Sequence, residues 1–237
     1  TAGGDAKVAL ASIAIQEKDF KKAEHLLLAA EAAGLTMNGL IAYYITRSMV
    51  ESHLGHHLEA LACARKAILI VPKQYGHSPK KSGGIYYRSY RDALRALILA
   101  AIRYIETATE TSFVKIAAEI ERNFGRDAPK HFGVAARFWC DEPETFVVYL
   151  ALGNTAFRIG RYEDAIKAYK EAWKRCLKKH SDMRRIILLN RALALRHMAK
   201  RPGIREGLVR QHLRDAAGFY AQVALDRRAS KQLRYWA

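Results

Sequence analysis

Apolar side chains recur at intervals of three and four residues along most of the chain, which is the spacing of amphipathic helices rather than of strands. The pattern predicts an all-α protein in which helices and short turns alternate. Gly34 and Pro72 stand where helices should end, Pro143 where one should begin, and Pro202-Gly203 between the last two. The expected helices span residues 5–16, 19–33, 38–54, 57–71, 85–107, 110–123, 127–139, 143–159, 162–179, 182–200 and 204–226.

One helix–turn–helix unit, from Tyr149 to Ala172, has a regular pattern of small and large residues. Gly153 and Ala165 would let the paired helices approach closely, and Gly160 would form the turn between them. The residues expected to pack this unit are Leu152, Gly153, Gly160, Tyr162, Ala165, Tyr169 and Ala172. This pattern resembles the tetratricopeptide repeat. Leu177 stands where that family has its closing proline, which predicts that the second helix continues farther than usual.

Two earlier units share the resemblance. Leu10, Ala11, Ala14, Phe20, Ala23, Leu27 and Ala30 fit one unit, and Tyr44, Gly55, Ala60, Ala64, Ala67 and Pro72 fit the next. The resemblance implies a right-handed superhelical array of antiparallel helix pairs, an α-solenoid whose concave face holds a protein partner. We expect N-terminal repeat-like helix pairs over residues 1–72, a linker loop over 73–84, degenerate middle helices over 85–142, and C-terminal repeat-like pairs with a basic surface over 143–237.

A weaker similarity, to the pentatricopeptide repeat, covers residues 20–61, where Gly34-Leu35 precedes the Tyr43-Tyr44 pair. Pentatricopeptide repeats bind single-stranded RNA at one base per repeat, which requires several consecutive regular units. The similarity covers fewer than two units. We therefore do not expect this chain to read RNA base by base.

Composition excludes several classes of protein. With 5 prolines and 15 glycines among 237 residues, the chain is poor in turn formers for an all-β fold. The longest apolar run, Ala96–Ile102, is far shorter than the roughly 20 residues of a membrane-spanning helix. Cys63, Cys140 and Cys176 lie far apart in helical patterns, which indicates buried, reduced thiols of an intracellular protein. The chain begins with Thr1, which is consistent with a removed targeting segment. We therefore expect the protein in a mitochondrial or other organellar matrix, or otherwise in the cytoplasm.

The net charge of +17 is concentrated in the last third of the chain. Residues 1–156 carry 19 basic and 16 acidic side chains, whereas residues 157–237 carry 21 and 7. Like charges repel across a helical turn, so a stretch that lacks counter-charges predicts an external polyanion. RNA, an acidic protein and an anionic membrane surface all qualify, and RNA is our prediction. The expected contacts are Lys174, Arg175, Lys178, Lys179, Arg184, Arg185, Arg191, Arg196, Lys200 and Arg201.

Three clusters could carry chemistry, and each has a simpler interpretation. His53, His56 and His57 surround an expected turn and lack an acidic partner, so we predict no metal site. The acidic residues within Asp141–Glu144 are of the type favoured at a helix start. The stretch Lys80–Gly84 lacks the full residue order of a phosphate-binding loop. We predict no catalytic site and no cofactor.

Together these features predict a non-enzymatic adaptor. Its helical array would bind one or more proteins, and its basic C-terminal third would dock on RNA within a large ribonucleoprotein, such as an organellar ribosome. The alternative is a free-standing peptide-binding cochaperone or regulatory receptor with no nucleic-acid role. Its groove would recognise a peptide carboxylate through Arg158, Lys167 and Arg191. Neither function involves insertion into a membrane.

Overall fold

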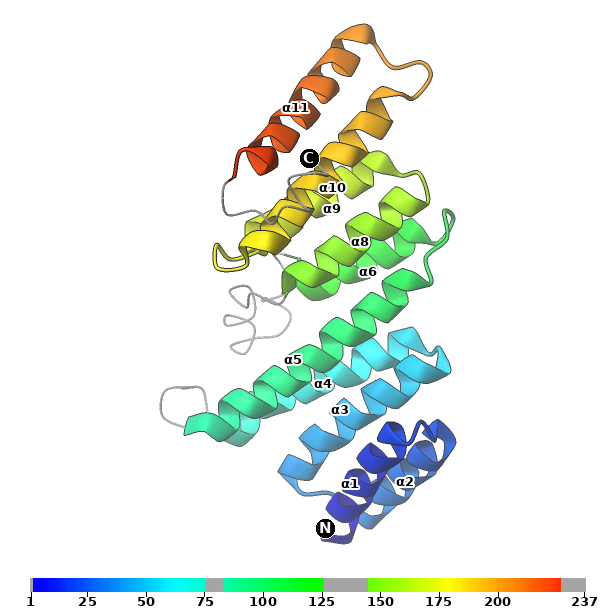
Figure 1. The fold of residues 1–237 in the computed structure, drawn as a ribbon. Helices are drawn as coiled ribbons and strands as arrows, with labels where there is room; N and C mark the ends of the chain where they lie inside the picture. Colours follow the sequence, from blue (N-terminus) through cyan, green and yellow to red (C-terminus); the bar gives the residue numbers. More distant parts are fainter. Residues whose placement is uncertain (1, 76–82, 126–144, 227–237) are drawn as a thin grey trace. The chain divides into compact units, whose positions relative to one another are not determined.

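The computed structural model describes residues 2–75, 83–125 and 145–226, and every regular element among them is a helix (Figure 1). This confirms the all-α class. None of these helices combines the length and hydropathy that a membrane crossing requires. The helices are α1 (Ala2–Gln16), α2 (Phe20–Ala33), α3 (Met37–Leu54), α4 (His57–Tyr75), α5 (Gly83–Glu106), α6 (Phe113–Phe124), α8 (Phe146–Arg158), α9 (Tyr162–Arg175), α10 (Ser181–Ala199) and α11 (Glu206–Ala224).

The chain divides into two compact units. Among the described residues, the first unit holds 2–75, 83–104 and 120–125, and the second holds 105–119 and 145–226. Within each unit, consecutive helices pack as pairs: α1 with α2, α3 with α4, α8 with α9, and α10 with α11. Packed neighbouring helix pairs are the predicted building blocks of a repeat-like α-solenoid, and the superhelical hand stays a prediction.

The first unit has a core of small and aliphatic side chains. Val8, Ala11, Ala23, Leu27 and other residues of α1 to α3 form one buried cluster. Small residues at this helix crossing let the two backbones approach, as the repeat pattern predicted. The structure thus buries the small residues that marked the first of the two N-terminal units.

Two side chains fix where the helices of the first unit begin. Asp19 accepts a hydrogen bond from the backbone N–H of Lys22 at the start of α2. Thr36 caps α3 by accepting from the N–H of Gly39, and its own hydroxyl donates to Asp5 of α1 at 2.6 Å. Such caps satisfy N–H groups that have no partner within the helix. The second cap also ties α3 to α1.

The second unit contains the best-preserved repeat, α8 with α9. Gly160, at φ +78°, forms the turn, and the N–H of Arg161 donates to the carbonyl of Ala156. Among the predicted packing residues, Leu152, Gly153, Ala165, Tyr169 and Ala172 are buried, and Gly160 and Tyr162 are half-buried.

The closest approach in this repeat is between Gly153 of α8 and Tyr169 of α9. A Cβ atom added at Gly153 would lie 2.5 Å from Cε1 of the tyrosine ring. No side chain heavier than hydrogen fits there, because such a distance is far inside van der Waals contact. The predicted role of Gly153 is thereby explained.

Several predicted helix boundaries differ from the structure, and those of α9, α4 and α5 affect the segments that follow or precede them. Helix α9 ends at Arg175 instead of continuing to 179, because Cys176 adopts an extended backbone conformation and its side chain packs in the interior. Helix α4 runs through Pro72 to Tyr75, and α5 begins at Gly83, so residues 73–75 and 83–84 of the predicted linker are helical. A proline removes one N–H donor from a helix, and the packing of α4 on α3 outweighs that loss. The helix predicted over 127–139 lies outside the described residues.

Candidate functional site

The ten cations predicted to bind a polyanion lie in the last turn of α9, the turn that follows it, and α10 with its C-terminal end. The structure separates them by exposure. Arg175, Arg184 and Arg191 are half-buried, and Arg185 is buried. The remaining six are exposed: Lys174, Lys178, Lys179, Arg196, Lys200 and Arg201.

Within the part of the chain that the structure describes, most of these exposed cations have no neutralising carboxylate. Lys174 pairs with Glu171 at 2.5 Å. Across residues 2–75, 83–125 and 145–226, no carboxylate lies within ion-pair distance of Lys178, Lys179, Arg196 or Lys200. Their charge is therefore available to an external anion.

One further lysine extends this set. Lys170 is exposed on α9, four residues before Lys174, and Lys178 follows in the turn after α9. Residues four apart lie along one face of a helix, so Lys170 and Lys174 share a face of α9. Sequence reasoning missed Lys170 because it considered only residues 174–201, although the spacing was visible. We call Lys170, Lys178, Lys179, Arg196 and Lys200 the basic surface.

Four of the predicted arginines place their guanidinium groups over aromatic rings. The guanidinium carbons lie at these distances from the ring centroids: Arg184 to Trp173, 3.8 Å; Arg175 to Tyr149 and Arg191 to Phe219, 4.6 Å each; Arg201 to Tyr162, 5.1 Å. Such cation–π contacts hold a guanidinium in place without cancelling its charge.

Burial lowers the pKa of Arg191 from its usual value, and the charge of nearby Asp215 opposes this. The arginines of this region combine a packing role with a persistent positive charge.

Arg185 does not serve as predicted. Its side chain is buried, with Nε and Nη2 donating to Oδ2 of Asp226 at 2.8 and 2.7 Å and Nη1 donating to Oδ1 of Asp182 at 2.5 Å. Burial by itself would lower the pKa of Arg185, but the hydrogen bonds that its guanidinium donates to the two carboxylates raise it. Arg185 therefore joins α10 to the end of α11 and is unavailable to an external polyanion.

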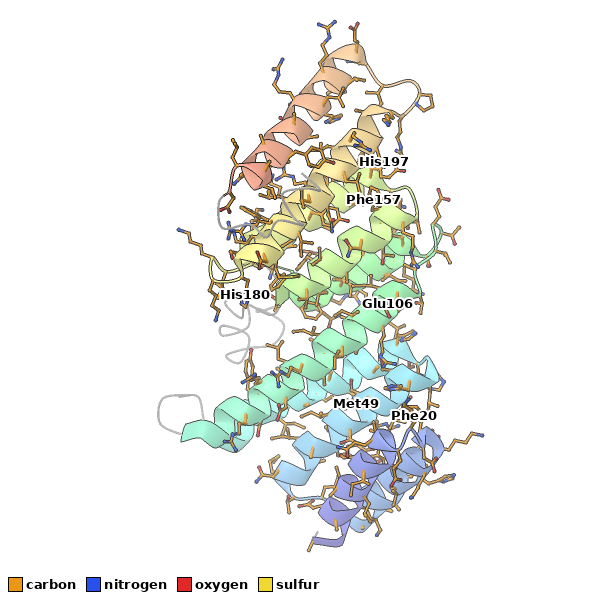
Figure 2. The ribbon with its side chains drawn as sticks, viewed as in Figure 1. Phe20, Met49, Glu106, Phe157, His180 and His197 are labelled. Atoms are coloured by element: carbon orange, nitrogen blue, oxygen red, sulfur yellow. The ribbon has the colours of Figure 1, made fainter. Side chains whose placement is uncertain are left out.

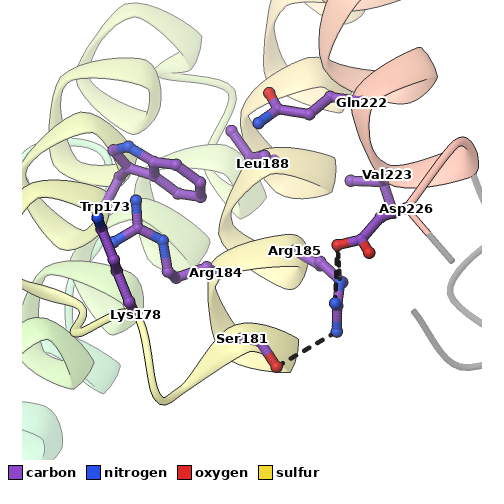
Figure 3. Close-up of a pocket in the computed structure, with 9 residues that line it drawn as sticks. All are labelled: Trp173, Lys178, Ser181, Arg184, Arg185, Leu188, Gln222, Val223 and Asp226. Carbon is purple, nitrogen blue, oxygen red and sulfur yellow. Dashed lines mark hydrogen bonds and ion pairs between the residues drawn. The ribbon is translucent and has the colours of Figure 1, made fainter. Parts of the chain in front are cut away.

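A cavity of about 420 Å³ lies beside this ion pair, between α9, α10 and α11 (Figure 3). Trp173 and Lys178 come from α9 and the turn after it, and Arg184 comes from the first turn of α10. Gln222 and Asp226 belong to α11 and the residues that follow it. Its polar wall is thus mainly cationic.

A second cavity, of about 190 Å³, lies beside α8 and α10 and includes Tyr169 of α9 in its lining. Asn154 Oδ1 accepts from the Tyr169 hydroxyl at 2.9 Å and from Asn190 Nδ2 at 3.1 Å. Phe157 also lines this cavity and meets His197 edge-on, with 5.2 Å between ring centroids (Figure 2).

The three cations predicted to hold a peptide carboxylate are not brought together there. Arg158 donates to the carbonyl of Glu106, Lys167 lies 3.9 Å from Asp164, and Arg191 lies over Phe219. None of the three lines the 190 Å³ cavity. The carboxylate-binding groove has no support from this arrangement.

The three histidines of the first unit, His53, His56 and His57, each contact a different side chain. The His53 ring stacks on Phe20, with 4.1 Å between centroids. His56 Nδ1 lies 2.9 Å from Glu51, and the His57 ring stacks on Tyr104. Within the part of the chain that the structure describes, no three metal-binding side chains come together.

The remaining candidate groups are the cysteines, the acidic residues of 141–144, residues 80–82 and Trp173. Cys63 and Cys176 are free, buried thiols whose pKa is raised by burial. Cys140, the acidic residues of 141–144 and residues 80–82 lie outside the described residues. Trp173 packs against the buried cluster of Leu188, Leu189 and Val223, so its side chain has a structural role as well as the contact with Arg184.

Comparison with known proteins identifies a family resemblance in one part of the chain. The sequence model of the tetratricopeptide repeat family matches residues 147–176, which are α8, α9 and the turn between them. Neither the curated proteins nor the solved structures yielded a match to the chain. Repeats of this family are typically non-catalytic modules that bind other proteins. Residues 147–176 are therefore identified as a tetratricopeptide repeat, and α1 with α2, α3 with α4 and α10 with α11 pack as neighbouring pairs within their own units.

Proposed function

We propose that this chain is a non-enzymatic scaffold that binds proteins through its helical repeats and RNA through its basic surface. The RNA would belong to a large ribonucleoprotein of which the chain is a subunit, such as an organellar ribosome. The observation that carries the RNA part is the set of exposed cations on α9, α10 and their ends that have no carboxylate within ion-pair distance among the described residues.

The distribution of these cations favours a long polyanion over a compact one. Lys178 and Lys179 precede α10, whereas Arg196 and Lys200 lie at its end. Helix α10 has 19 residues, and at about 1.5 Å per residue such a helix is about 28 Å long. A single acidic side chain reaches one end only. An RNA backbone carries phosphates along its whole length and can contact both ends.

The arginine–aromatic pairs add a second argument for RNA. Arg184 and Arg175 keep their positive charge while their guanidinium planes are held by rings. Guanidinium planes are surfaces on which unpaired bases stack. An acidic protein would use the charge but not the plane.

The basic surface is tested by reversing four of its charges in the full chain: Lys178→Glu, Lys179→Glu, Arg196→Glu and Lys200→Glu. Each of these side chains is exposed, so the helices should form as in the wild type. The matched control reverses four exposed lysines outside α8–α11, namely Lys18, Lys21, Lys66 and Lys115. Both variants change the net charge by the same amount, so a difference between them reports position.

The measurement is the affinity for a structured RNA at 50 and 200 mM salt. If about four phosphates are neutralised, the wild-type affinity should fall roughly a hundredfold between these conditions. The four basic-surface substitutions should weaken binding at 50 mM salt by a hundredfold or more, and the control by less than tenfold. Equal losses in the two variants would mean that only net charge matters and would overturn the assignment of this surface.

Membership of a ribonucleoprotein is tested in cells. RNA crosslinks within residues 174–237, together with cosedimentation in a large particle that nuclease disperses, are the expected result. A small complex that nuclease leaves intact, without crosslinks, would contradict it.

A second candidate function, a free-standing peptide receptor, is favoured by the cavity beside α8 and α10. The Asn154 and Asn190 amides lie at its edge, and amides can bond an extended peptide backbone. Binding of this kind should change little between 50 and 200 mM salt. A nuclease-insensitive partner whose retention depends on Asn154 and Asn190 would favour this function over the first.

A further inference from the structure

The 420 Å³ cavity beside Arg185 has the size and the chemistry of a ligand site. Cavities of about 300 to 1,000 Å³ are typical of small-molecule sites. Lys178 and Arg184 line it with positive charge, whereas the charge of Arg185 is compensated by Asp226, which also lines the cavity, and by Asp182. Oδ2 of the Asp226 carboxylate accepts two hydrogen bonds from Arg185. Lys178 and Arg184 therefore remain to attract an anion.

One corner of the cavity can hold a phosphate. Lys178 is exposed and has no ion pair among the described residues. Ser181 Oγ accepts a hydrogen bond from Arg185 Nη1 at 3.4 Å, which leaves the serine O–H free to donate to a ligand (Figure 3). Ser181 is also the first residue of α10, whose N-cap His180 makes no side-chain capping bond. A phosphate here would meet an ammonium group, a hydroxyl donor and the positive end of a helix.

Another wall offers a flat surface. The Arg184 guanidinium lies 3.8 Å from the Trp173 ring centroid, and its Nη1 donates to the carbonyl of Cys176 at 2.7 Å. One side of the guanidinium plane is thus taken by the indole, and the group is held in position. Figure 3 shows Trp173, Arg184 and Lys178 on one side of the cavity and Gln222 on the opposite side. A planar base stacked on Arg184 would face an amide that can both donate and accept hydrogen bonds.

We propose that this cavity binds one unpaired nucleotide, with its phosphate at Lys178 and Ser181 and its base stacked on Arg184. The inference rests on the proposed RNA-binding function and assigns a single-stranded element of the RNA to a particular site. A carboxylate side chain would use the cations but would leave the Arg184 plane and Gln222 without a partner. A nucleotide uses all of them.

The test uses the full chain and two labelled probes, a single-stranded oligouridylate and an RNA duplex of the same length. The pocket variants are Arg184→Lys, which keeps the charge and removes the planar group, and Lys178→Gln. Their matched controls are Arg196→Lys, also on α10, and Lys179→Gln, the neighbouring residue; neither control residue lines the cavity. Thermal melts followed by circular dichroism establish that each variant folds, and Lys178→Gln serves alone should Arg184→Lys unfold.

Arg184→Lys should weaken single-strand binding about tenfold, because stacking of one base contributes roughly 5- to 150-fold in affinity. Duplex binding should change less than twofold, since paired bases are not free to stack. Lys178→Gln should weaken single-strand binding more than Lys179→Gln does. Arg196→Lys should change neither probe by more than twofold.

The outcomes separate this inference from the proposed function. If the wild type binds RNA with a steep salt dependence but pocket and control variants behave alike, the nucleotide site is wrong and the RNA-binding surface stands. If the wild type binds neither probe with a steep salt dependence, the proposed function itself fails. If a polyglutamate peptide displaces the single strand and Arg184→Lys weakens the peptide equally, the cavity takes carboxylates, and the nucleotide inference is overturned.

Discussion

The α3–α4 hairpin of the first unit and the α8–α9 hairpin of the second differ in what joins their paired helices. Ser48 precedes Ala64 by sixteen residues, and Gly153 precedes Tyr169 by the same interval. In α3–α4 the Ser48 hydroxyl donates to the carbonyl of Ala60 at 2.8 Å, whereas in α8–α9 the tyrosine ring occupies the space that a side chain at 153 would need. In α8–α9, positions 153 and 169 therefore share one volume, whereas in α3–α4 a hydrogen bond joins the two helices.

The two hairpins also differ in how they neutralise an arginine beside a tyrosine. Arg47 lies 5.8 Å from the Tyr43 ring and forms ion pairs with Glu51 at 3.3 Å and Glu31 at 3.6 Å. Arg175 lies 4.6 Å from the Tyr149 ring, and no carboxylate of the described residues lies within ion-pair distance. The first unit compensates its cation and the second does not. Together with the exposed cations of the basic surface, this difference makes the second unit the candidate for polyanion binding.

The largest effect on stability should come from removing the Tyr169 ring, which fills the space where α8 and α9 cross. Tyr169→Ala should lower the free energy of unfolding by about 3 to 5 kcal/mol, because Gly153 has no side chain that could fill the cavity. Urea denaturation followed by circular dichroism measures the change. Tyr169→Phe, which removes only the hydrogen bond to exposed Asn154, is the control and should cost about 1 kcal/mol or less. Equal losses for the two variants would show that the ring volume is not what stabilises the crossing.

A smaller effect is expected from adding one carbon atom at the same place. Gly153→Ala should destabilise the protein by about 2 kcal/mol, since Tyr169 would have to move. The double variant Gly153→Ala/Tyr169→Leu should recover most of the loss, because Ala11 and Leu27 stand at the same interval in the α1–α2 hairpin. The same denaturation assay checks both.

Ser48→Ala is the matched control for this experiment in the first unit. It keeps the Cβ atom and removes a buried hydrogen bond, so it should cost about 1 kcal/mol. A double variant at 153 and 169 that is less stable than Gly153→Ala would contradict the idea of a shared volume.

The repeat itself was predictable from the sequence because its packing depends on residues at fixed intervals within one hairpin. Gly153 lies at the close approach of α8 and α9 and Gly160 in the turn, whereas Tyr169, expected to pack beside the next unit, lies against Gly153 within the same hairpin. The end of α9 was mispredicted, since the extended backbone at Cys176 reflects burial of that side chain and not a local breaking residue.

The candidate site was only partly predictable. The charge excess was visible in the sequence, but one of the two carboxylate partners of Arg185 is Asp226, which lies 41 residues away after α11. Arg184 and Trp173 lie on different helices, so their contact requires the α9–α10 packing. Sequence spacing alone therefore could not separate the arginines that pack from the lysines that remain available.

The smallest expected effect on stability concerns Arg47 and Arg175, which each lie over a tyrosine ring. Arg47→Gln should lower the free energy of unfolding by about 1 kcal/mol at 50 mM salt and by less at 500 mM, because its ion pairs with Glu31 and Glu51 are partly exposed and salt screens them. Arg175→Gln should cost about 0.5 to 1 kcal/mol at both salt concentrations, since its contact with Tyr149 is a short-range cation–π interaction. Urea denaturation of the two variants at both salt concentrations distinguishes the cases. A salt-dependent loss for Arg175→Gln equal to that of Arg47→Gln would mean that Arg175 is paired with a carboxylate in solution, and the contrast between the two units would then lose its basis.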